Sequence, residues 1–405
     1  MTALVRVPTG DVAAVTAALR DALDGGPAVW PVAETTVGTA PDSRGAADAL
    51  PADVLRADAL PADVPDGVAL VVETSGSTEA PKRVALSAAA LRASAEATAE
   101  RMGGHGRWLL ALPAHYIAGA QVLVRSILAG TEPAVLDGGH FEPGAFVEAT
   151  ARLMRTRDAR PRLTSLVPVQ LARLVEAAAG DPDHEVAGAL RAYAGILIGG
   201  QALPEPVRVA AAVLGARVVR TYGASETAGG CVYDGRPLPG VRVRVAGDGV
   251  VELGGPTLAD GYLGDPARTT RAFTTDSDGS RWYRTGDLGE LSPEGVLRIR
   301  GRADDVIISG GVKVALGEIE RAVRTLPGLA DAVVVAVPDR EWGERAAVVA
   351  TGASVSLDAL AAATDAAGLP PAGRPVRLVV ADPLPMLASG KPDRRAIAAL
   401  ARDHA

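Results

Sequence analysis

The sequence predicts an α/β protein: a large N-terminal domain of layered α/β subdomains with a small β-rich subdomain, followed by a small mobile α+β C-terminal domain. From Val68 onward, short apolar runs alternate with Ala-, Leu- and Arg-rich stretches of helical periodicity, which indicates layered helices and sheets. Over residues 241–299 the pattern changes to short apolar runs between Gly, Pro and Asp turns, which is typical of a β-rich subdomain. We therefore expect domains over residues 1–303 and 304–405.

The first elements are predicted to be a strand and an amphipathic helix, in the stretch MTALVRVPTGDVAAVTAALRDAL. The next segment, residues 36–67, is rich in Ala, Asp and Pro, and it contains the repeat ADALPADV at Ala47–Val54 and again at Ala57–Val64. Because this segment has few aromatic side chains to bury, we expect a mobile acidic insertion on the surface.

The later elements follow from local patterns. The expected strands of the layered part are VALVVET, WLLALP, AGILIGG and ARVVRTYG, and its expected helices include SAAALRASAEATAERM and PVQLARLVEAAAG. The β-rich part contains VRVRVAGDGVVELGG and GVLRIRG. The C-terminal unit has its own alternation of LGEIERAVRTL, ADAVVVAVPD and RAAVVATG, which predicts a separate domain.

Composition narrows the class of function. The chain has 405 residues with 48% hydrophobic content, enough to bury a sizeable core. A net charge of −7 argues against nucleic acid as a partner and favours a small substrate. The single cysteine, Cys231, excludes an internal disulfide and a multi-cysteine metal site, and we expect it to be an apolar filler. No apolar run reaches the length of a membrane span and the start does not resemble a signal peptide, so we expect a cytoplasmic protein.

Lysine is rare in this chain. Of 41 basic residues only Lys82, Lys313 and Lys391 are lysines. A compact ammonium can point a single charge into a crowded oxyanion, which a planar guanidinium cannot do. The alternative is that the three lysines are ordinary surface residues. The sequence around each lysine distinguishes the two interpretations.

The loop TSGSTEAPK, Thr74–Lys82, combines backbone N–H groups, hydroxyls and one cation between two apolar runs. This combination suits the β- and γ-phosphates of a nucleotide. It is not a Walker A loop, which needs G-x-x-x-x-G-K followed by Ser or Thr, because Arg83 follows the lysine. A plain solvated turn is the alternative for the loop taken alone.

Four further motifs follow this loop in order. They are TYGASET at Thr221–Thr227, YRTGDLGEL at Tyr283–Leu291, GRADDVIISGGVKVALGEIE at Gly301–Glu320 and PMLASGKPDR at Pro385–Arg394. Together the five resemble the acyl-adenylate-forming, or AMP-binding, superfamily of acyl-CoA synthetases, adenylation domains and luciferases, over about residues 68–394. The segments LPAHYIAGAQVLVRSILAG and TYGASETAGGCVYDGRPLPGVRVRV resemble one branch, the o-succinylbenzoate-CoA ligases of menaquinone biosynthesis.

The resemblance implies an AMP-forming acid–thiol ligase. Such an enzyme joins a carboxylate to AMP with loss of pyrophosphate, and then exchanges AMP for the thiol of coenzyme A. ATP, coenzyme A and a small carboxylic acid would be the substrates, and Mg²⁺ would help to neutralise the meeting anions. The implied acid is 2-succinylbenzoate; the alternative is another acyl or aryl acid, or the loading of a carrier protein. A non-catalytic nucleotide sensor would need motif losses that the sequence does not have, and a homodimer is left open.

The resemblance also assigns the nucleotide site. The implied ATP- and AMP-binding residues are Thr74, Ser75, Gly76, Ser77, Thr78, Lys82, Gly199, Gly200, Gln201, Thr221, Tyr222, Gly223, Thr227, Asp287 and Arg302. Glu226 would hold Mg²⁺. Asp287 would bind both ribose hydroxyls with help from Arg302, although a turn-capping role is the alternative for Asp287 alone. Tyr222 would pack on the adenine ring, and alone it could equally be a core aromatic residue.

The C-terminal motifs imply a mobile lid. Lys391 matches the catalytic lysine that would bridge the substrate carboxylate and the α-phosphate. Asp304 matches the hinge about which the domain swings, so that the thiol can reach the same carbonyl in the second half-reaction. Gly310, Gly311 and Lys313 resemble the strand that lines the path of the pantetheine arm.

His115 and Arg125 are the candidate residues for the acid. His115 matches a family position that packs beside the acyl carbonyl, and the alternative is a satisfied core histidine. Arg125 lies among Val, Leu and Ile, where an unpaired charge is costly. We predict that it holds the aromatic carboxylate of 2-succinylbenzoate, and the alternative is an internal salt bridge.

Overall fold

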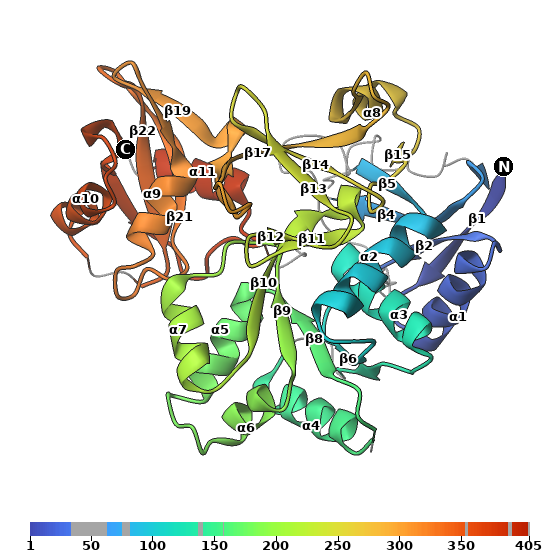
Figure 1. Cartoon of the computed structure of the whole chain (residues 1–405). Helices are drawn as coiled ribbons and strands as arrows, with labels where there is room; N and C mark the ends of the chain where they lie inside the picture. Colours follow the sequence, from blue (N-terminus) through green and yellow to red (C-terminus); the bar gives the residue numbers. More distant parts are fainter. Residues whose placement is uncertain are drawn as a thin grey trace, which may run out of the picture.

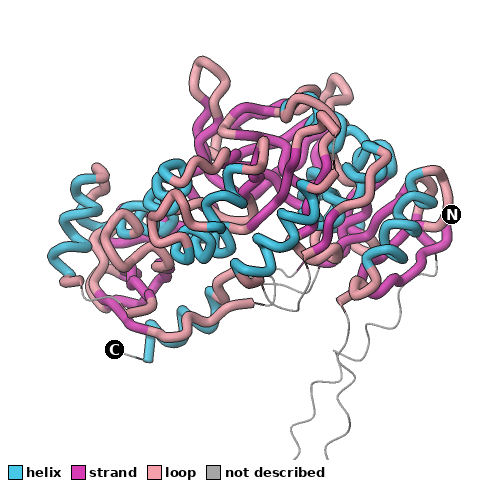
Figure 2. Tube along the Cα trace, turned by 90° about the horizontal axis from the view of Figure 1, so that it is seen from below, coloured by secondary structure: helices cyan, strands magenta, loops and turns pink. Residues whose placement is uncertain are grey.

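The computed structural model describes residues 1–33, 63–74, 82–136, 141–156, 158–352, 355–387 and 391–403. These residues form four β-sheets with helices packed between and around them, which confirms the predicted α/β class (Figure 1). The two chain termini lie at opposite ends of the molecule in both views (Figure 2). No helix in the described ranges has both the length and the apolar character needed to span a bilayer.

The first sheet contains the start of the chain and the strands around the predicted phosphate loop. Its order is β15 (Gly261–Tyr262), β5 (Lys82–Ser87), β4 (Val68–Thr74), β2 (Ala28–Val32), β1 (Thr2–Pro8) and β3 (Asp63–Val64). The apolar run of β4 is buried over its first five residues, as expected for a strand covered on both faces. Helix α1 (Val12–Leu23) begins where the Asp11 carboxylate accepts from the Ala14 amide at 2.9 Å, an N-terminal cap.

The acidic insertion was predicted to extend to residue 67, and its last part is instead folded. Strand β3 pairs antiparallel with β1, with Val64 opposite Thr2. The side chain of Val64 is completely buried and packs in a cluster with Trp30, Val68 and Val71. Burial of this apolar side chain anchors residues 63–67, so the prediction is wrong there. Residues 36–62 lie outside the described residues.

The second sheet supplies the edge on which most of the predicted nucleotide residues lie. Its order is β12 (Arg236–Pro237), β11 (Gly229–Tyr233), β10 (Val218–Ala224), β9 (Gly195–Ile198), β8 (Arg162–Leu166), β6 (Arg107–Leu110) and β7 (Ala134–Val135). Strands β10, β9, β8, β6 and β7 are parallel, so their carboxyl ends share one edge, the usual ligand edge of such sheets.

Helices cover both faces of this sheet (Figure 1). Helices α2 (Ala88–Arg101) and α3 (Ile117–Ala129) share a core with the first and second sheets. The opposite face is covered by α4 (Pro143–Met154), α5 (Pro168–Ala177), α6 (Glu185–Arg191) and α7 (Glu205–Val213). Cys231 is buried in the shared core, where burial raises the pKa of its thiol to about 12, as suits an apolar filler.

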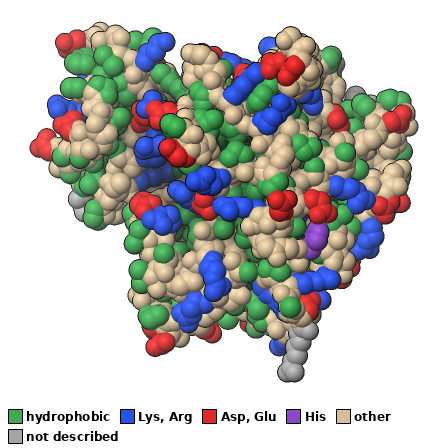
Figure 3. Space-filling view, in the orientation of Figure 1, with side chains coloured by type: hydrophobic (Ala, Val, Ile, Leu, Met, Phe, Trp, Pro, Cys, Tyr) green, Lys and Arg blue, Asp and Glu red, His purple; other side chains and the backbone are tan. Residues whose placement is uncertain are grey.

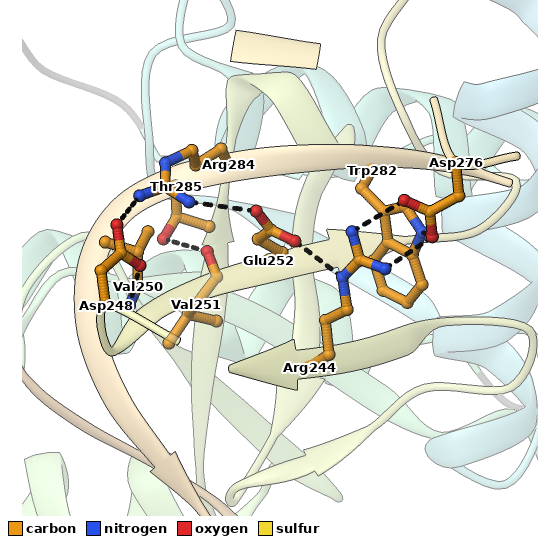
Figure 4. A network of polar contacts seen from close by, with 9 residues as sticks. All are labelled: Arg244, Asp248, Val250, Val251, Glu252, Asp276, Trp282, Arg284 and Thr285. Carbon is orange, nitrogen blue, oxygen red and sulfur yellow. Dashed lines mark hydrogen bonds and ion pairs between the residues drawn. The ribbon is translucent and has the colours of Figure 1, made fainter. Parts of the chain in front are cut away.

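The third sheet is the predicted β-rich part. It contains β13 (Arg242–Val245), β14 (Val250–Gly254), β17 (Arg281–Leu291) and β16 (Phe273–Thr275), with β18 (Leu297–Arg302) paired to β17; helix α8 (Pro266–Ala272) precedes β16. Glu252 of β14 is only 7% exposed, and Arg244 and Arg284 donate to its two oxygens at 2.7 and 3.2 Å (Figure 4). Because Arg244 lies on β13 and Arg284 on β17, the buried carboxylate of Glu252 ties three strands together. Arg244 also pairs with Asp276.

The fourth sheet forms the C-terminal unit. Its strands are β20 (Val312–Ala315), β19 (Val306–Ser309), β22 (Gly343–Ala350), β21 (Val333–Asp339) and β23 (Arg377–Val380), covered by α9 (Leu316–Val323), α10 (Leu357–Ala366) and α11 (Arg394–Asp403). It buries two apolar clusters made only of its own residues. The short helix η3 (Ala303–Asp305) joins β18 to β19, and the predicted domain boundary at residue 304 falls inside it. The division into domains stays a prediction.

Candidate active site

Thr74 and Lys82 face each other at the loop end of the β4–β5 hairpin, where they are the two ends of the predicted phosphate loop. Ser75, Gly76, Ser77 and Thr78 lie outside the described residues. The Lys82 ammonium lies 5.7 Å from the centre of the Tyr262 ring, and it has no ion pair within the described ranges. Its charge is therefore available for an anion. The neighbouring Arg83 is not, because its Nε donates to Glu73 at 3.2 Å.

Glu226 follows β10 in the short helix η2 (Ser225–Thr227) and is 6% exposed. The hydroxyl of Tyr262 donates to its Oε1 at 2.8 Å, whereas Oε2 accepts no hydrogen bond from any described residue. No group of three or more potential ligands for a metal occurs among the described residues. Mg²⁺ usually binds one or two carboxylates together with phosphates, so a single buried carboxylate with one free oxygen fits that ion.

Asp287 on β17 is held by two donors from different strands. Tyr222 of β10 donates its hydroxyl to Oδ2 at 2.7 Å, and Arg302 of β18 donates from Nη1 to Oδ1 at 3.2 Å. Burial raises the pKa of Asp287, although the hydrogen bond from Tyr222 and the charge of Arg302 oppose the shift. Burial also raises the pKa of Tyr222, which remains a donor. The structure thus brings together Tyr222, Asp287 and Arg302, which come from three separate motifs, and their roles toward a nucleotide stay predictions.

Gly199, Gly200 and Gln201 follow β9 at the carboxyl edge of the second sheet, beside Thr221 on β10. A Cβ on Gly199 would lie 2.4 Å from Oγ1 of Thr221, so only glycine permits this close approach. Thr221 in turn donates to the Ile198 carbonyl at 3.2 Å. This contact holds the ends of the two strands together below the site.

Thr227 has a different position from the one expected of a nucleotide ligand. It is completely buried, its Oγ1 accepts from the Ala224 amide at 2.9 Å, and it donates to the Gly229 carbonyl at 2.8 Å. Its hydroxyl is therefore used within the turn that carries Glu226. Gly223 lies at the irregularity where β10 meets β11. Both residues shape the backbone around Glu226.

Lys391 comes from the C-terminal unit and lies among groups of the other sheets. Its side chain is exposed, yet enough protein surrounds the ammonium for burial to lower its pKa. The carboxylates of Glu226 and Asp287 act in the opposite direction, and Arg302 adds to the lowering. The Lys391 ammonium therefore lies within electrostatic range of Glu226 and Asp287, and its catalytic role stays a prediction.

Arg302 also contacts the predicted hinge. Its Nε donates to Oδ1 of Asp304 at 3.0 Å, and its Nη1 donates to the Thr285 carbonyl at 3.2 Å. One guanidinium therefore links Asp287 with Asp304, the first residue of the predicted C-terminal domain. Asp304 is exposed and lies in a three-residue helix.

Gly310, Gly311 and Lys313 form the β19–β20 hairpin of the C-terminal unit. Gly310 has a φ of +55°, and a Cβ there would lie 2.6 Å from the Trp342 ring. Lys313 is exposed. No hydrogen bond or ion pair in the described part of the chain joins this hairpin to Glu226, Asp287 or Lys391, so the structure does not bring it into the cluster.

His115 lies in the turn before α3 and is half-buried. Its Nδ1 lies 3.3 Å from the Thr9 hydroxyl, and burial lowers the pKa of the ring. Thr9 Oγ1 also donates to the Val32 carbonyl at 3.2 Å. A carbonyl can only accept, so Thr9 makes both contacts when it accepts from His115 Nδ1–H. Nothing in the local sequence pattern pointed to Thr9.

Arg125 is 6% exposed on α3, and no carboxylate in the described ranges pairs with it. The internal salt bridge that the sequence left open is therefore absent from those ranges. The guanidinium lies 4.9 Å from the Trp108 ring, and its Nε has no hydrogen-bond partner. Burial lowers the pKa of Arg125, and Tyr233 partly offsets this. One helical turn earlier, Gln121 Oε1 is also buried without a partner.

Basic side chains gather where the C-terminal unit meets the rest of the molecule (Figure 3). Strand β18 contributes three exposed arginines, Arg298, Arg300 and Arg302, and it packs against α9 of the C-terminal unit. Two of the three are ion-paired, Arg300 with Glu290 and Glu318 and Arg302 with Asp287 and Asp304.

The sequence did not identify Tyr262, whose side chain contacts both Lys82 and Glu226. It lies in a two-residue strand, too short to give a periodic signal, and pairs with β5, which is distant in the sequence. Only that pairing places it between Lys82 and Glu226.

Comparison with known proteins adds independent findings. Residues 11–268 match the family described as AMP-binding enzyme, and residues 318–391 match the AMP-binding enzyme C-terminal domain. The probable 2-succinylbenzoate–CoA ligase of Mycobacterium tuberculosis is 43% identical over 82% of this chain and 84% of that protein. The 2-succinylbenzoate–CoA ligase of Lactococcus lactis is 29% identical over 80% of this chain and 69% of that protein.

Solved structures agree in fold. The o-succinylbenzoate CoA synthetase of Bacillus subtilis, in complex with its acyl-adenylate intermediate, has a TM-score of 0.69 and 27% identity over 82% of this chain and 69% of that chain. An amide bond synthetase from Marinactinospora thermotolerans has a TM-score of 0.71 and 26% identity over 98% of this chain and 80% of that chain. Together with the match over more than half of its length, these findings establish that the chain belongs to the AMP-binding enzyme family.

Proposed function

We propose that the protein is an AMP-forming acid–thiol ligase, which joins 2-succinylbenzoate to coenzyme A through an acyl-adenylate. The observation that carries the proposal is that Asp287 accepts from both Tyr222 and Arg302, which brings together residues of three separate motifs. The printed names of the ligases from Mycobacterium tuberculosis and Lactococcus lactis support this choice of acid.

In the first half-reaction the protein holds ATP and brings two anions together. Asp287, oriented by Tyr222 and Arg302, accepts from the ribose hydroxyls. Lys82 and Thr74, with the loop between them, bind the triphosphate. Glu226 would hold Mg²⁺, which supplies positive charge at the phosphates when bound.

Lys391 then provides the mobile charge at the reacting centre. A single ammonium can sit between the substrate carboxylate and the α-phosphate, where charge develops on the phosphorus oxygens. The wider guanidinium fork of arginine would not fit both anions in the same way. This role explains why a lysine remains in a chain with so few of them.

In the second half-reaction the C-terminal unit turns about Asp304. Lys391 leaves the carbonyl, and the hairpin with Gly310, Gly311 and Lys313 takes its place to line the path of the thiol. The ion pair between Arg302 and Asp304 must rearrange in this movement. The exposed position of Asp304 in a short helix is compatible with such a turn.

The acid is held by Arg125 and His115. Arg125 is buried without a carboxylate partner in the described ranges, and its Nε, a donor, has no hydrogen-bond partner there. A buried charge is costly unless it is paired, so an anionic group of the substrate would complete this site. The aromatic carboxylate of 2-succinylbenzoate is such a group, and His115 would lie beside the acyl carbonyl.

Pyrophosphate release over a panel of acids, with thioester detected by mass, tests the proposal. We expect release with 2-succinylbenzoate and ATP, and a thioester when coenzyme A is added. The proposal fails if another acid gives the higher kcat/KM, or if adenylate forms but coenzyme A does not accept the acyl group. An amine that accepts it instead would favour an amide synthetase, as the likeness to the Marinactinospora enzyme allows.

A further inference from the structure

We propose that Tyr262 is a positioning residue that fixes both charges of the phosphate site, its hydroxyl orienting Glu226 and its ring supporting Lys82. This inference rests on the proposed ATP-dependent function, which assigns those two residues to Mg²⁺ and to the triphosphate. Tyr262 itself belongs to none of the five sequence motifs.

The backbone of Tyr262 is held firmly. Strand β15 pairs antiparallel with β5, with Tyr262 opposite Val84 and Gly261 opposite Ala85. The Tyr262 amide donates to Thr269 Oγ1 at 2.9 Å. Lys82 and Val84 are two residues apart on β5 and so point to the same face, within diagonal reach of the Tyr262 ring. The ring is only 6% exposed.

The hydroxyl of Tyr262 makes the only side-chain hydrogen bond that Glu226 accepts from the described residues. A buried carboxylate needs such a donor. Because the bond uses Oε1, it selects one orientation of the carboxylate and leaves Oε2 for a ligand. A second contact, from the Ala259 amide to the Glu226 carbonyl at 2.9 Å, fastens the segment before β15 to the same turn.

The ring of Tyr262 acts on the other charge. At 5.7 Å the Lys82 ammonium is within the range of a cation–π contact. A carboxylate in this place would neutralise the lysine, whereas the ring holds it and leaves its charge for a phosphate. One side chain therefore sets the positions of an anion and a cation that face the same ligand.

Two substitutions separate these contacts. Tyr262→Phe removes the hydroxyl and keeps the ring, whereas Tyr262→Leu removes both. The measurement is ATP binding to the full-length protein by calorimetry, once with EDTA and once with Mg²⁺. With Tyr262→Phe, the affinity in EDTA should be unchanged, and the gain in affinity on adding Mg²⁺ should fall by about 10- to 100-fold. With Tyr262→Leu, the affinity in EDTA should also fall, by about 2- to 5-fold.

Tyr193→Phe is the matched control. Tyr193 is completely buried, and its hydroxyl contacts Thr150 Oγ1 at 2.8 Å in the core beneath the second sheet. It should lose comparable stability without a change in either affinity. In a Glu226→Gln background, Tyr262→Phe should cause no further loss of the Mg²⁺ effect.

The outcomes separate the two proposals. If the wild-type protein binds ATP more tightly with Mg²⁺ and Tyr262→Phe keeps the whole gain, the role of Tyr262 is wrong while the proposed function stands. Equal loss in Tyr262→Phe and Tyr193→Phe would also overturn it, since it would reflect stability alone. If the wild-type protein binds no ATP at all, the proposed function fails, and the inference fails with it.

Discussion

The carboxylate of Asp287 is held between a neutral donor and a charged one, the Tyr222 hydroxyl and the Arg302 guanidinium. Burial alone would favour its protonated form, which cannot accept from two ribose hydroxyls in one plane. The two donors oppose that shift and fix the plane of the carboxylate. The same guanidinium also donates to Asp304, in the short helix η3.

A pH prediction follows for Tyr222→Phe, which keeps the ring and removes the donor. Loss of the hydrogen bond raises the pKa of Asp287 further, so on acidification the ionised form is lost at a higher pH. We expect the acid limb of AMP affinity to move to higher pH, measured by titration across the acidic range. Tyr193→Phe should leave the limb in place, and a limb that stays or moves down in Tyr222→Phe would contradict the assignment.

Substitution of Arg125 tests the choice of acid. If Arg125 holds the ring carboxylate as proposed, Arg125→Ala removes a charge-assisted hydrogen bond worth about 1.5 to 3 kcal/mol. At about 1.4 kcal/mol per factor of ten, kcat/KM for 2-succinylbenzoate should fall by roughly 10- to 150-fold. An analogue without the ring carboxylate should be affected far less, because it cannot use the contact.

Stability is the control for this variant. The thermal midpoint must be measured beside the two kcat/KM values, since Arg125 also lies against the Trp108 ring. If both acids lose activity alike, or the midpoint falls while their ratio stays constant, Arg125 is a structural residue.

The elements themselves show which parts of the fold the sequence could predict. The run VALVVET became β4 without change of bounds, because a continuous apolar run buried on both faces is a local signal. Strands β3 and β15 gave no such signal, since each has two residues and exists only through pairing with a distant partner. For the same reason Thr9 and Tyr262, which contact His115 and Glu226, could not be found from local pattern.

The short helix η3 is the element that the proposed movement uses. Asp304→Pro fixes φ at the proposed hinge. We expect the adenylate to form and accumulate, while thioester formation falls, as measured by separate assays of the two half-reactions. Asp304→Ala removes the carboxylate bonded to Arg302 but leaves the backbone free, so it should retain both steps. If Pro and Ala partition the two steps identically, the hinge lies elsewhere.

At the scale of the whole molecule, the candidate site draws on residues from all parts of the chain. The first sheet supplies Lys82, the second supplies Tyr222 and the third supplies Asp287, and the short helix after β10 supplies Glu226. The C-terminal unit, with apolar clusters of its own, supplies Lys391. A group that belongs to a separately packed unit can be withdrawn without unfolding the rest, which two successive reactions at one carbonyl require.

The most direct test of this account measures the two half-reactions of Lys391→Ala separately. Pyrophosphate release from ATP and acid should fall by several orders of magnitude, and Lys391→Arg should not restore it. Conversion of a supplied acyl-adenylate and coenzyme A to thioester should remain, whereas Lys313→Ala should show the opposite pattern. Equal loss of both half-reactions in Lys391→Ala would contradict the claim that the C-terminal unit brings this lysine to the nucleotide for the first step alone.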